Sequence, residues 1–110
     1  MENKEVLRNP RNEVSLEGRV SNVPTEKLLP SGDSVVEFRM VIDRKVARSD
    51  RREVDTLDVA IWLAKVKPKA LKLQVDDWVS VEGSIRRRFW QAPQGLASRW
   101  QVEASQLRRL

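Results

Sequence analysis

The chain has 110 residues, of which 40% are hydrophobic and 34% charged, so it is long enough for one globular domain with a modest core. Its net charge of +5 and its pI of about 10.1 favour an anionic partner, of which nucleic acid is the commonest. Because it contains no cysteine and no histidine, disulfides, thiolate chemistry and imidazole acid–base catalysis are excluded, and the sequence predicts no enzyme activity, no metal site and no cofactor.

The amino-terminal end is polar. Residues 1–12 hold no apolar stretch of the kind that a secretory signal needs, and Asn9-Pro10-Arg11-Asn12 breaks any regular element. No segment approaches the roughly 20 apolar residues that span a bilayer. We therefore expect a cytoplasmic protein with no membrane partner, in which residues 1–12 form a flexible arm and residues 13–110 form one folded domain.

Three segments in the first half of the domain alternate between apolar and polar residues, as strands with one buried face do. They cover residues 14–20, 35–43 and 55–62, and Gly18 in the first favours a bend. A tight turn is expected at 30–33. The predicted buried residues are Val14, Leu16, Val20, Val36, Phe38, Met40, Ile42, Leu57, Val59 and Ile61.

A short helix is predicted between residues 63 and 75. Val66, Ala70 and Leu73 recur there at helical spacing, and Pro68 suits the first turn of a helix. The helix separates the third predicted strand from the fourth.

Two more strands are predicted at 78–88 and 99–107, with a turn between them at 92–95. Gly83 indicates a bulge in the former. The core candidates of that strand are Val79, Val81 and Ile85, and Trp78, which opens the run, is expected to be structural.

Five short, bent strands with one helix between the third and the fourth are typical of an all-β OB-fold barrel, which binds oligonucleotides across its strands and through its loops. A small SH3-like barrel has similar strands but usually lacks this helix. The sequence therefore favours the five-stranded OB fold.

Tryptophan and arginine are interleaved in these strands. Trp62 falls on the polar face of its strand, and arginines precede both Trp90 and Trp100. Exposed indoles stack on bases and guanidinium groups neutralise phosphates, so the pattern predicts binding of single-stranded DNA without sequence preference; the same chemistry fits RNA. Residues 44–54 show neither periodicity and are predicted to form a basic loop. The candidate binding residues are Trp62, Trp90, Trp100, Arg44, Lys45, Arg48, Arg51, Arg52, Arg86, Arg87, Arg88 and Arg99.

Several motifs, taken in order, are shared with one family. They are the segment from Asn12 to Val20 with Pro24, Ser31-Gly32 followed by Val36-Glu37-Phe38, and most specifically Val79 to Trp90, which is similar to Val-Glu-Gly-x-Leu-x-x-Arg-x-Trp. On these motifs, residues 11–110 resemble the bacterial single-stranded DNA-binding protein family. The resemblance implies a homotetramer or homodimer that binds single-stranded DNA in replication, recombination or repair, with Trp62, Trp90 and Trp100 as stacking platforms.

The sequence departs from the family's pattern at two stacking positions and at its end. Two further tryptophans of the family fall at about Val46 and Thr56 here. The family's partner-recruiting acidic tail is absent, since the sequence ends at Arg108-Arg109-Leu110. Either a longer protein is trimmed at this point, or this is a variant that binds single strands without recruiting partners.

Two alternatives fit the same residues. Primosomal replication protein N, a short tailless OB dimer that binds single strands, is similar but lacks the close match from Val81 to Trp90. An OB-fold protein-interaction module is the other, because aromatic and arginine side chains also suit interface hot spots.

Overall fold

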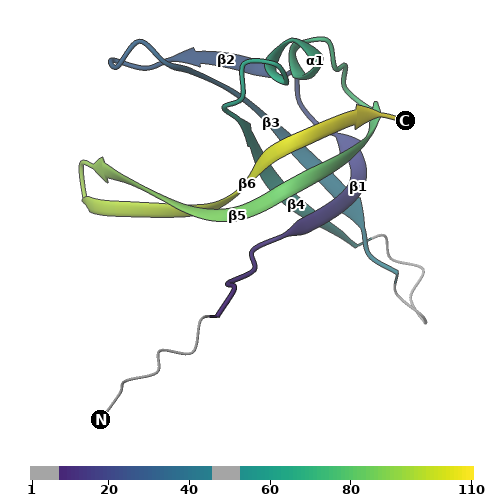
Figure 1. The fold of residues 1–110 in the computed structure, drawn as a ribbon, viewed down its shortest axis with the longest axis horizontal. Helices are drawn as coiled ribbons and strands as arrows, with labels where there is room; N and C mark the ends of the chain where they lie inside the picture. The colour runs from purple at the N-terminus through teal and green to yellow at the C-terminus, as the bar shows by residue number, and fades with distance from the viewer. Residues whose placement is uncertain (1–7, 46–52) are drawn as a thin grey trace.

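The computed structural model describes residues 8–45 and 53–110, which form a mostly β structure with one short helix (Figure 1). This confirms the predicted class. No helix in these two ranges is long and apolar enough to cross a membrane. In chain order the elements are β1 (Val14–Val20), β2 (Thr25–Leu28), β3 (Ser34–Asp43), β4 (Val54–Ile61), α1 (Lys67–Leu71), β5 (Trp78–Ala92) and β6 (Gly95–Arg109).

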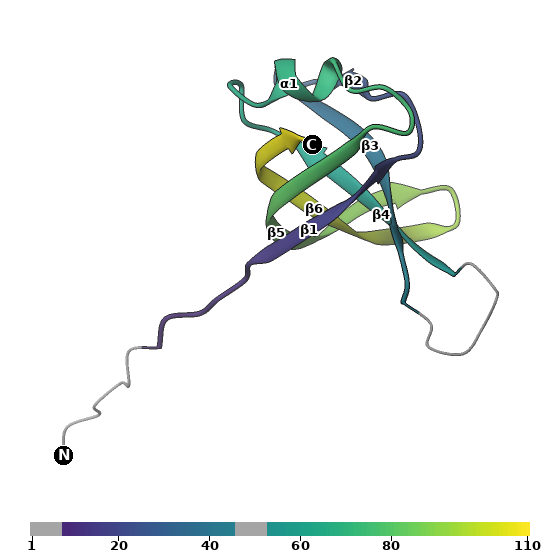
Figure 2. The same ribbon diagram turned by 90° about the vertical axis from the view of Figure 1, so that its right-hand side faces the viewer.

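The strands form a ring. They pair in the order β1-β5-β6-β4-β3-β2, and a further antiparallel pairing of β1 with β3 joins the two sides. The contact between β4 and β6 is parallel and short, with Val59 opposite Val102 and Ala60 opposite Glu103. Five strands therefore enclose the core, and the ring is seen in Figure 2.

The core lies inside the ring and under α1. Of the residues predicted as buried in β1, β3 and β4, Val20, Met40 and Ile61 are fully buried, and Val14, Leu16 and Ile42 are partly buried against the core. Complete burial of such a side chain contributes roughly 1.5–3 kcal/mol to stability. Leu57, near the start of β4, is only half-buried and lies outside the core, contrary to prediction. The predicted helix is confirmed: Val66, Ala70 and Leu73 of α1 and its flanks are buried against the core, and α1 covers one end of the ring in Figure 2.

The short strand β2 was not predicted. It pairs antiparallel with the start of β3 through the turn at residues 29–33, where Gly32 has a φ of +93°. All four residues of β2 are exposed, so β2 carries no alternation of buried and exposed positions that could have revealed it. It lies outside the ring of five and leaves the predicted strand order intact.

β5 and β6 are longer than predicted. The bulge predicted at Gly83 of β5 lies instead on β6, opposite that glycine. Glu82 pairs with Gln106 and Gly83 with Ala104, so Ser105 of β6 is the extra residue. A Cβ on Gly83 would approach the carbonyl oxygen of Glu103, which explains the glycine. The inward parity of β5 is kept.

Ile85 is nevertheless not part of the core, contrary to prediction. It is 41% exposed, although it faces the inner side opposite Val102. The reason is that β1 pairs with β5 only as far as Gly83, so the ring no longer covers Ile85. Trp78, at the other end of β5, is also outside the core: it is 49% exposed, and the Arg19 guanidinium lies 6.0 Å from its ring.

The predicted flexible arm, residues 1–12, lies mostly outside the described residues. Residues 8–13 belong to no strand or helix. The side chain of Asn12 is attached to β5: its amide nitrogen donates to the Ile85 carbonyl at 2.7 Å, and its oxygen accepts from the Ile85 N–H at 2.9 Å. The boundary between arm and domain at residue 12 stays a prediction.

Candidate nucleic-acid interface

Beyond the ring, β5 and β6 continue as a two-stranded ribbon, here called the extension (residues 86–92 and 95–101). Its strands pair only with each other within the described structure, because β1 begins opposite Gly83 and β4 reaches β6 at Val102. Figure 1 shows the ribbon projecting past the other strands. It ends in the turn predicted at 92–95, where Gly95 has a φ of +122°.

Strand alternation divides the predicted residues between two faces of the extension. Arg88 is opposite Arg99 and Arg87 is opposite Trp100, so neighbouring pairs point to opposite sides. We name the sides by their tryptophans. The Trp90 face carries Arg86, Arg88, Trp90, Ala97, Arg99 and Gln101, and the Trp100 face carries Arg87, Phe89, Leu96, Ser98 and Trp100, next to Ile85.

The Trp90 face meets the outer side of β3 and β4. A small cavity of about 260 Å³ is lined there by Lys27, Glu37, Gln101 and three of the predicted residues, Arg88, Trp90 and Arg99. Trp90 is 42% exposed.

Trp62 joins this cluster through Arg88. It directly follows β4 and is half-buried, and the Arg88 guanidinium carbon lies 6.0 Å from the centre of its ring. The structure therefore brings four of the predicted binding residues together: Trp62, Arg88, Trp90 and Arg99.

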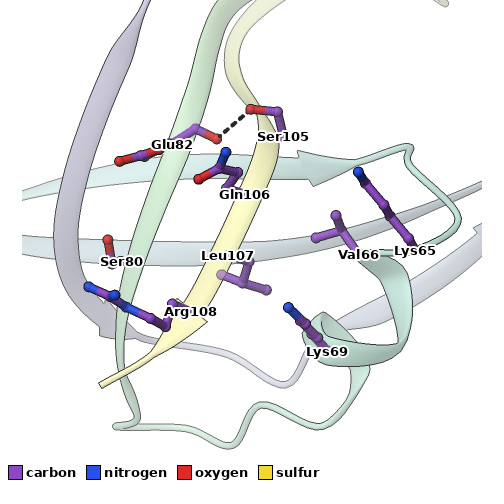
Figure 3. A pocket seen from close by; sticks show the side chains of 9 residues that line it. All are labelled: Lys65, Val66, Lys69, Ser80, Glu82, Ser105, Gln106, Leu107 and Arg108. Atoms are coloured by element: carbon purple, nitrogen blue, oxygen red, sulfur yellow. Dashed lines mark hydrogen bonds between the residues drawn. The ribbon is translucent and has the colours of Figure 1, made fainter.

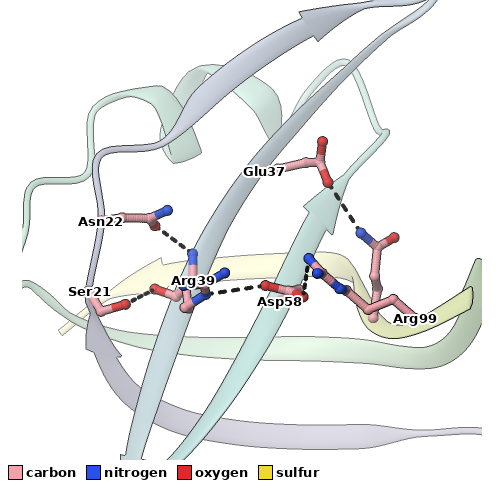
Figure 4. Close-up of polar contacts among 7 residues, drawn as sticks. Ser21, Asn22, Glu37, Arg39, Asp58 and Arg99 are labelled. Atoms are coloured by element: carbon pink, nitrogen blue, oxygen red, sulfur yellow. Dashed lines mark hydrogen bonds and ion pairs between the residues drawn. The ribbon is translucent and has the colours of Figure 1, made fainter. Parts of the chain in front are cut away.

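Carboxylates on the ring pair with the arginines of this face. Asp58 of β4 contacts Arg99 at 3.2 Å and Arg39 of β3 at 3.4 Å (Figure 4). Glu37 lies 3.8 Å from Arg88 and accepts a hydrogen bond from the Gln101 amide at 3.2 Å. These acids hold the arginine side chains in place, and they also offset part of their positive charge.

Arg86 belongs to the same face and has its own partner. Its Nε lies 3.7 Å from a Glu103 oxygen. Arg86 is largely open to water and Glu103 is partly so, and the pair therefore contributes at most about 1 kcal/mol to stability.

The Trp100 face holds the other two predicted residues of the extension. The Arg87 guanidinium carbon lies 5.7 Å from the Trp100 ring and 5.2 Å from the ring of Phe89. Its Nε and Nη2 donate to the Ser98 hydroxyl at 3.1 and 2.9 Å. Phe89 was not among the predicted binding residues.

The basic loop is only partly described. Arg48, Arg51 and Arg52 lie outside the described residues. Lys45 is exposed. Arg44 contacts Asp55 at 2.7 Å and Glu53 at 3.4 Å, and hydrogen bonding and charge attraction to Asp55 raise the pKa of Arg44 and lower that of Asp55.

Arg44 is not part of the tryptophan cluster. Figure 1 places the end of β3 and the start of β4 on the opposite side of the molecule from the tip of the extension. The structure thus brings together the extension residues with Trp62, and it leaves the described part of the basic loop apart from them.

A separate groove of about 510 Å³ lies between α1 and the outer side of β5 and β6 (Figure 3). Lys65, Lys69 and Arg108 give it a positive lining, with Glu82 as its one acidic side chain. No aromatic ring of the described chain lines it. Its cations therefore lack the stacking partners that the extension provides.

Proteins of known description resemble this chain in amino-acid sequence. Two bacterial proteins described as single-stranded DNA-binding protein, from Clostridium tetani and Oceanobacillus iheyensis, are each 27% identical to this chain over 85 residues. These alignments cover 76% of the chain but only 59% and 53% of the relatives, so the chain matches little more than half of their length.

A solved structure shows the same fold. The structure titled "Plasmodium falciparum SSB complex with ssDNA" superposes with a TM-score of 0.81 at 20% identity, covering 96% of this chain and 99% of that one. The likeness confirms the predicted OB fold. The model of the single-strand binding protein family matches residues 11–110, and the chain therefore belongs to that family.

Proposed function

We propose that the chain binds single-stranded DNA without sequence preference, as a non-enzymatic cytoplasmic protein that acts in replication, recombination or repair. The observation that carries the proposal is the cluster on the Trp90 face, where the exposed Trp90 lines a cavity with Arg88 and Arg99, and the half-buried Trp62 lies beside Arg88. Every base has a flat π-face, so stacking on Trp62 and Trp90 does not select a sequence.

Two energetic terms support binding. Stacking contributes roughly 1–3 kcal/mol per base, and each neutralised phosphate of a single strand contributes about −0.7 to the slope of log affinity against log salt. In this proposal the arginines of the extension, with Arg44 and the other cations of the basic loop, supply the second term. The chain assembles as a homotetramer or homodimer.

Trp90→Ala tests the proposal. Fluorescence titration with oligo-dT should show affinity reduced by roughly 1–3 kcal/mol, with the circular dichroism spectrum unchanged because the side chain is partly exposed. The affinity of the native chain should fall steeply with added salt.

The matched control is Trp78→Ala. Trp78 is similarly exposed, at 49%, but it opens β5 at the end away from the extension. Its loss should leave oligo-dT affinity unchanged. Equal affinity of the native chain and Trp90→Ala would remove Trp90 from the site. No response of the native chain to oligo-dT would favour the protein-interaction module instead.

A further inference from the structure

We infer that the Trp100 face of the extension is a second contact surface for the same single strand, which passes around the ribbon from Trp90 to Phe89 and Trp100. The inference rests on the proposed function. It adds Phe89 to the binding residues, and it assigns Arg87 and Trp100 to a surface separate from the Trp90 face and Trp62.

The first observation is the chemistry of the face. Phe89 is 55% exposed and Trp100 is 61% exposed, so each ring is more accessible than Trp90 at 42%. The guanidinium of Arg87 lies within 6 Å of both rings. Two accessible rings beside one cation are the combination that stacks bases and neutralises a phosphate.

The second observation is that Arg87, unlike the other arginines of the extension, has no described carboxylate partner. Arg86, Arg88 and Arg99 on the Trp90 face each pair with a carboxylate. Arg87 instead bonds to the neutral hydroxyl of Ser98 and forms no ion pair within the described part of the chain. Its full charge is therefore available to a phosphate.

The third observation is that nothing separates the two surfaces except the ribbon itself. Trp90 and Phe89 are consecutive, so their Cα atoms are about 3.8 Å apart while their rings point to opposite sides. Within the described structure, both outer edges of the extension are unpaired. A strand stacked on Trp90 can therefore pass over an open edge to Phe89.

The charge also favours nucleic acid over a protein as the occupant. A protein surface that covered the apolar rings would bury the Arg87 guanidinium, which is costly unless the partner supplies a matching acid. A single strand brings one phosphate with each base that it stacks. The face therefore suits a continuing nucleic acid better than a dry protein contact.

The test compares oligo-dT of about 4 and about 16 nucleotides, the limits of the usual site size of one OB domain. Phe89→Ala and Trp100→Ala should each weaken binding of the longer strand by about 5- to 150-fold, as expected for a lost stacking partner. Binding of the shorter strand, which occupies the Trp90 face alone, should not change. Trp90→Ala should weaken both.

The matched control is Trp78→Ala, outside the extension. Trp78 is an indole that is 49% exposed at the other end of β5, so its loss should leave both affinities unchanged. The inference is wrong if Phe89→Ala and Trp100→Ala affect the longer strand no more than Trp78→Ala does. It is also wrong if they weaken the shorter strand equally, since the two faces would then be alternative sites.

Light scattering and the Trp90 variant separate the remaining outcomes. If Trp100→Ala lowers the mass of the assembly and leaves affinity for the longer strand unchanged, the face is an interface between copies and the inference fails. If Trp90→Ala has no effect at either length while Phe89→Ala weakens the longer strand, the assignment of Trp90 fails instead.

Discussion

The ring and the extension are built from the same two strands, yet they use strand alternation differently. In the ring, the inner residues of β5, such as Val79 and Val81, are fully buried. Beyond Gly83 the same inner side continues as Ile85, just before the extension, and as Phe89 within it, and these side chains are 41% and 55% exposed. Alternation therefore fixes the side on which a residue lies, whereas burial depends on whether another strand or helix covers that side.

The largest expected contrast is between two isoleucines. Ile61→Ala, in the ring, should lower the free energy of unfolding by about 2–5 kcal/mol, because Ile61 is fully buried and its loss leaves a cavity. Ile85→Ala should cost less than about 1 kcal/mol, since much of that side chain is already in water. Urea unfolding followed by tryptophan fluorescence measures both.

The same experiment can show that Ile61 and Ile85 do not differ in burial in solution. Equal losses for Ile61→Ala and Ile85→Ala would mean that Ile85 is covered in solution, for example within an assembly. Concentration dependence of the Ile85→Ala midpoint would then identify the cover as a second copy.

The difference also shows what sequence could predict. Periodicity identified β1, β3, β4 and α1, because each buries alternate or helically spaced residues in one core. It missed β2, where nothing is buried, and it placed Ile85 in the core, because periodicity does not report how far along β5 the pairing with β1 extends.

The candidate site follows the same rule. Trp62 was chosen as a binding residue from its strand parity, and Trp90, Arg88 and Arg99 from the interleaving of arginine and tryptophan, but the sequence did not predict that these four lie together. The split into two faces could have been found: once the turn is set at 92–95, counting outward from Ala92 opposite Gly95 places Arg87 opposite Trp100. The acidic partners could not, because Glu37 and Asp58 reach the extension only through closure of the ring.

Asp58→Asn should increase affinity for oligo-dT through the Trp90 face. Asp58 offsets the charge of Arg39 and Arg99 on the Trp90 face. Its neutralisation removes a negative charge beside the proposed path, so affinity for oligo-dT at low salt should rise by up to about 5-fold. Fluorescence titration at low and high salt measures the change, and the gain should shrink as salt screens it.

A fall in affinity for Asp58→Asn would contradict this expectation. It would indicate that Asp58 serves mainly to position Arg99, and that the arginine becomes less effective without it. Stability should change by no more than about 1 kcal/mol in either case, because the paired arginines are about half exposed.

Salt dependence should distinguish Arg87 from Arg88. Arg87→Gln should make the negative slope of log affinity against log salt shallower by about 0.7, the value for one phosphate of a single strand. Arg88→Gln should change it by less, since Glu37 already neutralises part of that charge. Titration of a strand of about 16 nucleotides over a series of salt concentrations measures the slope for each variant. If both variants lower the steepness by the same amount, the ion pair between Arg88 and Glu37 opens when the strand binds.

The smallest expected effect lies at the end of the ring that carries Arg44, and it is seen as a dependence on pH. The Arg44 hydrogen bond holds the pKa of Asp55 below its ordinary value of 3.8. A carboxyl with a lowered folded-state pKa stabilises the fold at neutral pH, and this contribution is lost as the pH falls below about 4. Asp55→Asn lacks the contribution at every pH, so its unfolding midpoint should fall less steeply than that of the native chain between neutral and acid pH. Parallel curves for the two proteins would mean that Asp55 does not hold Arg44 in solution, and Glu53 would then be the remaining described carboxylate that offsets the charge of Arg44.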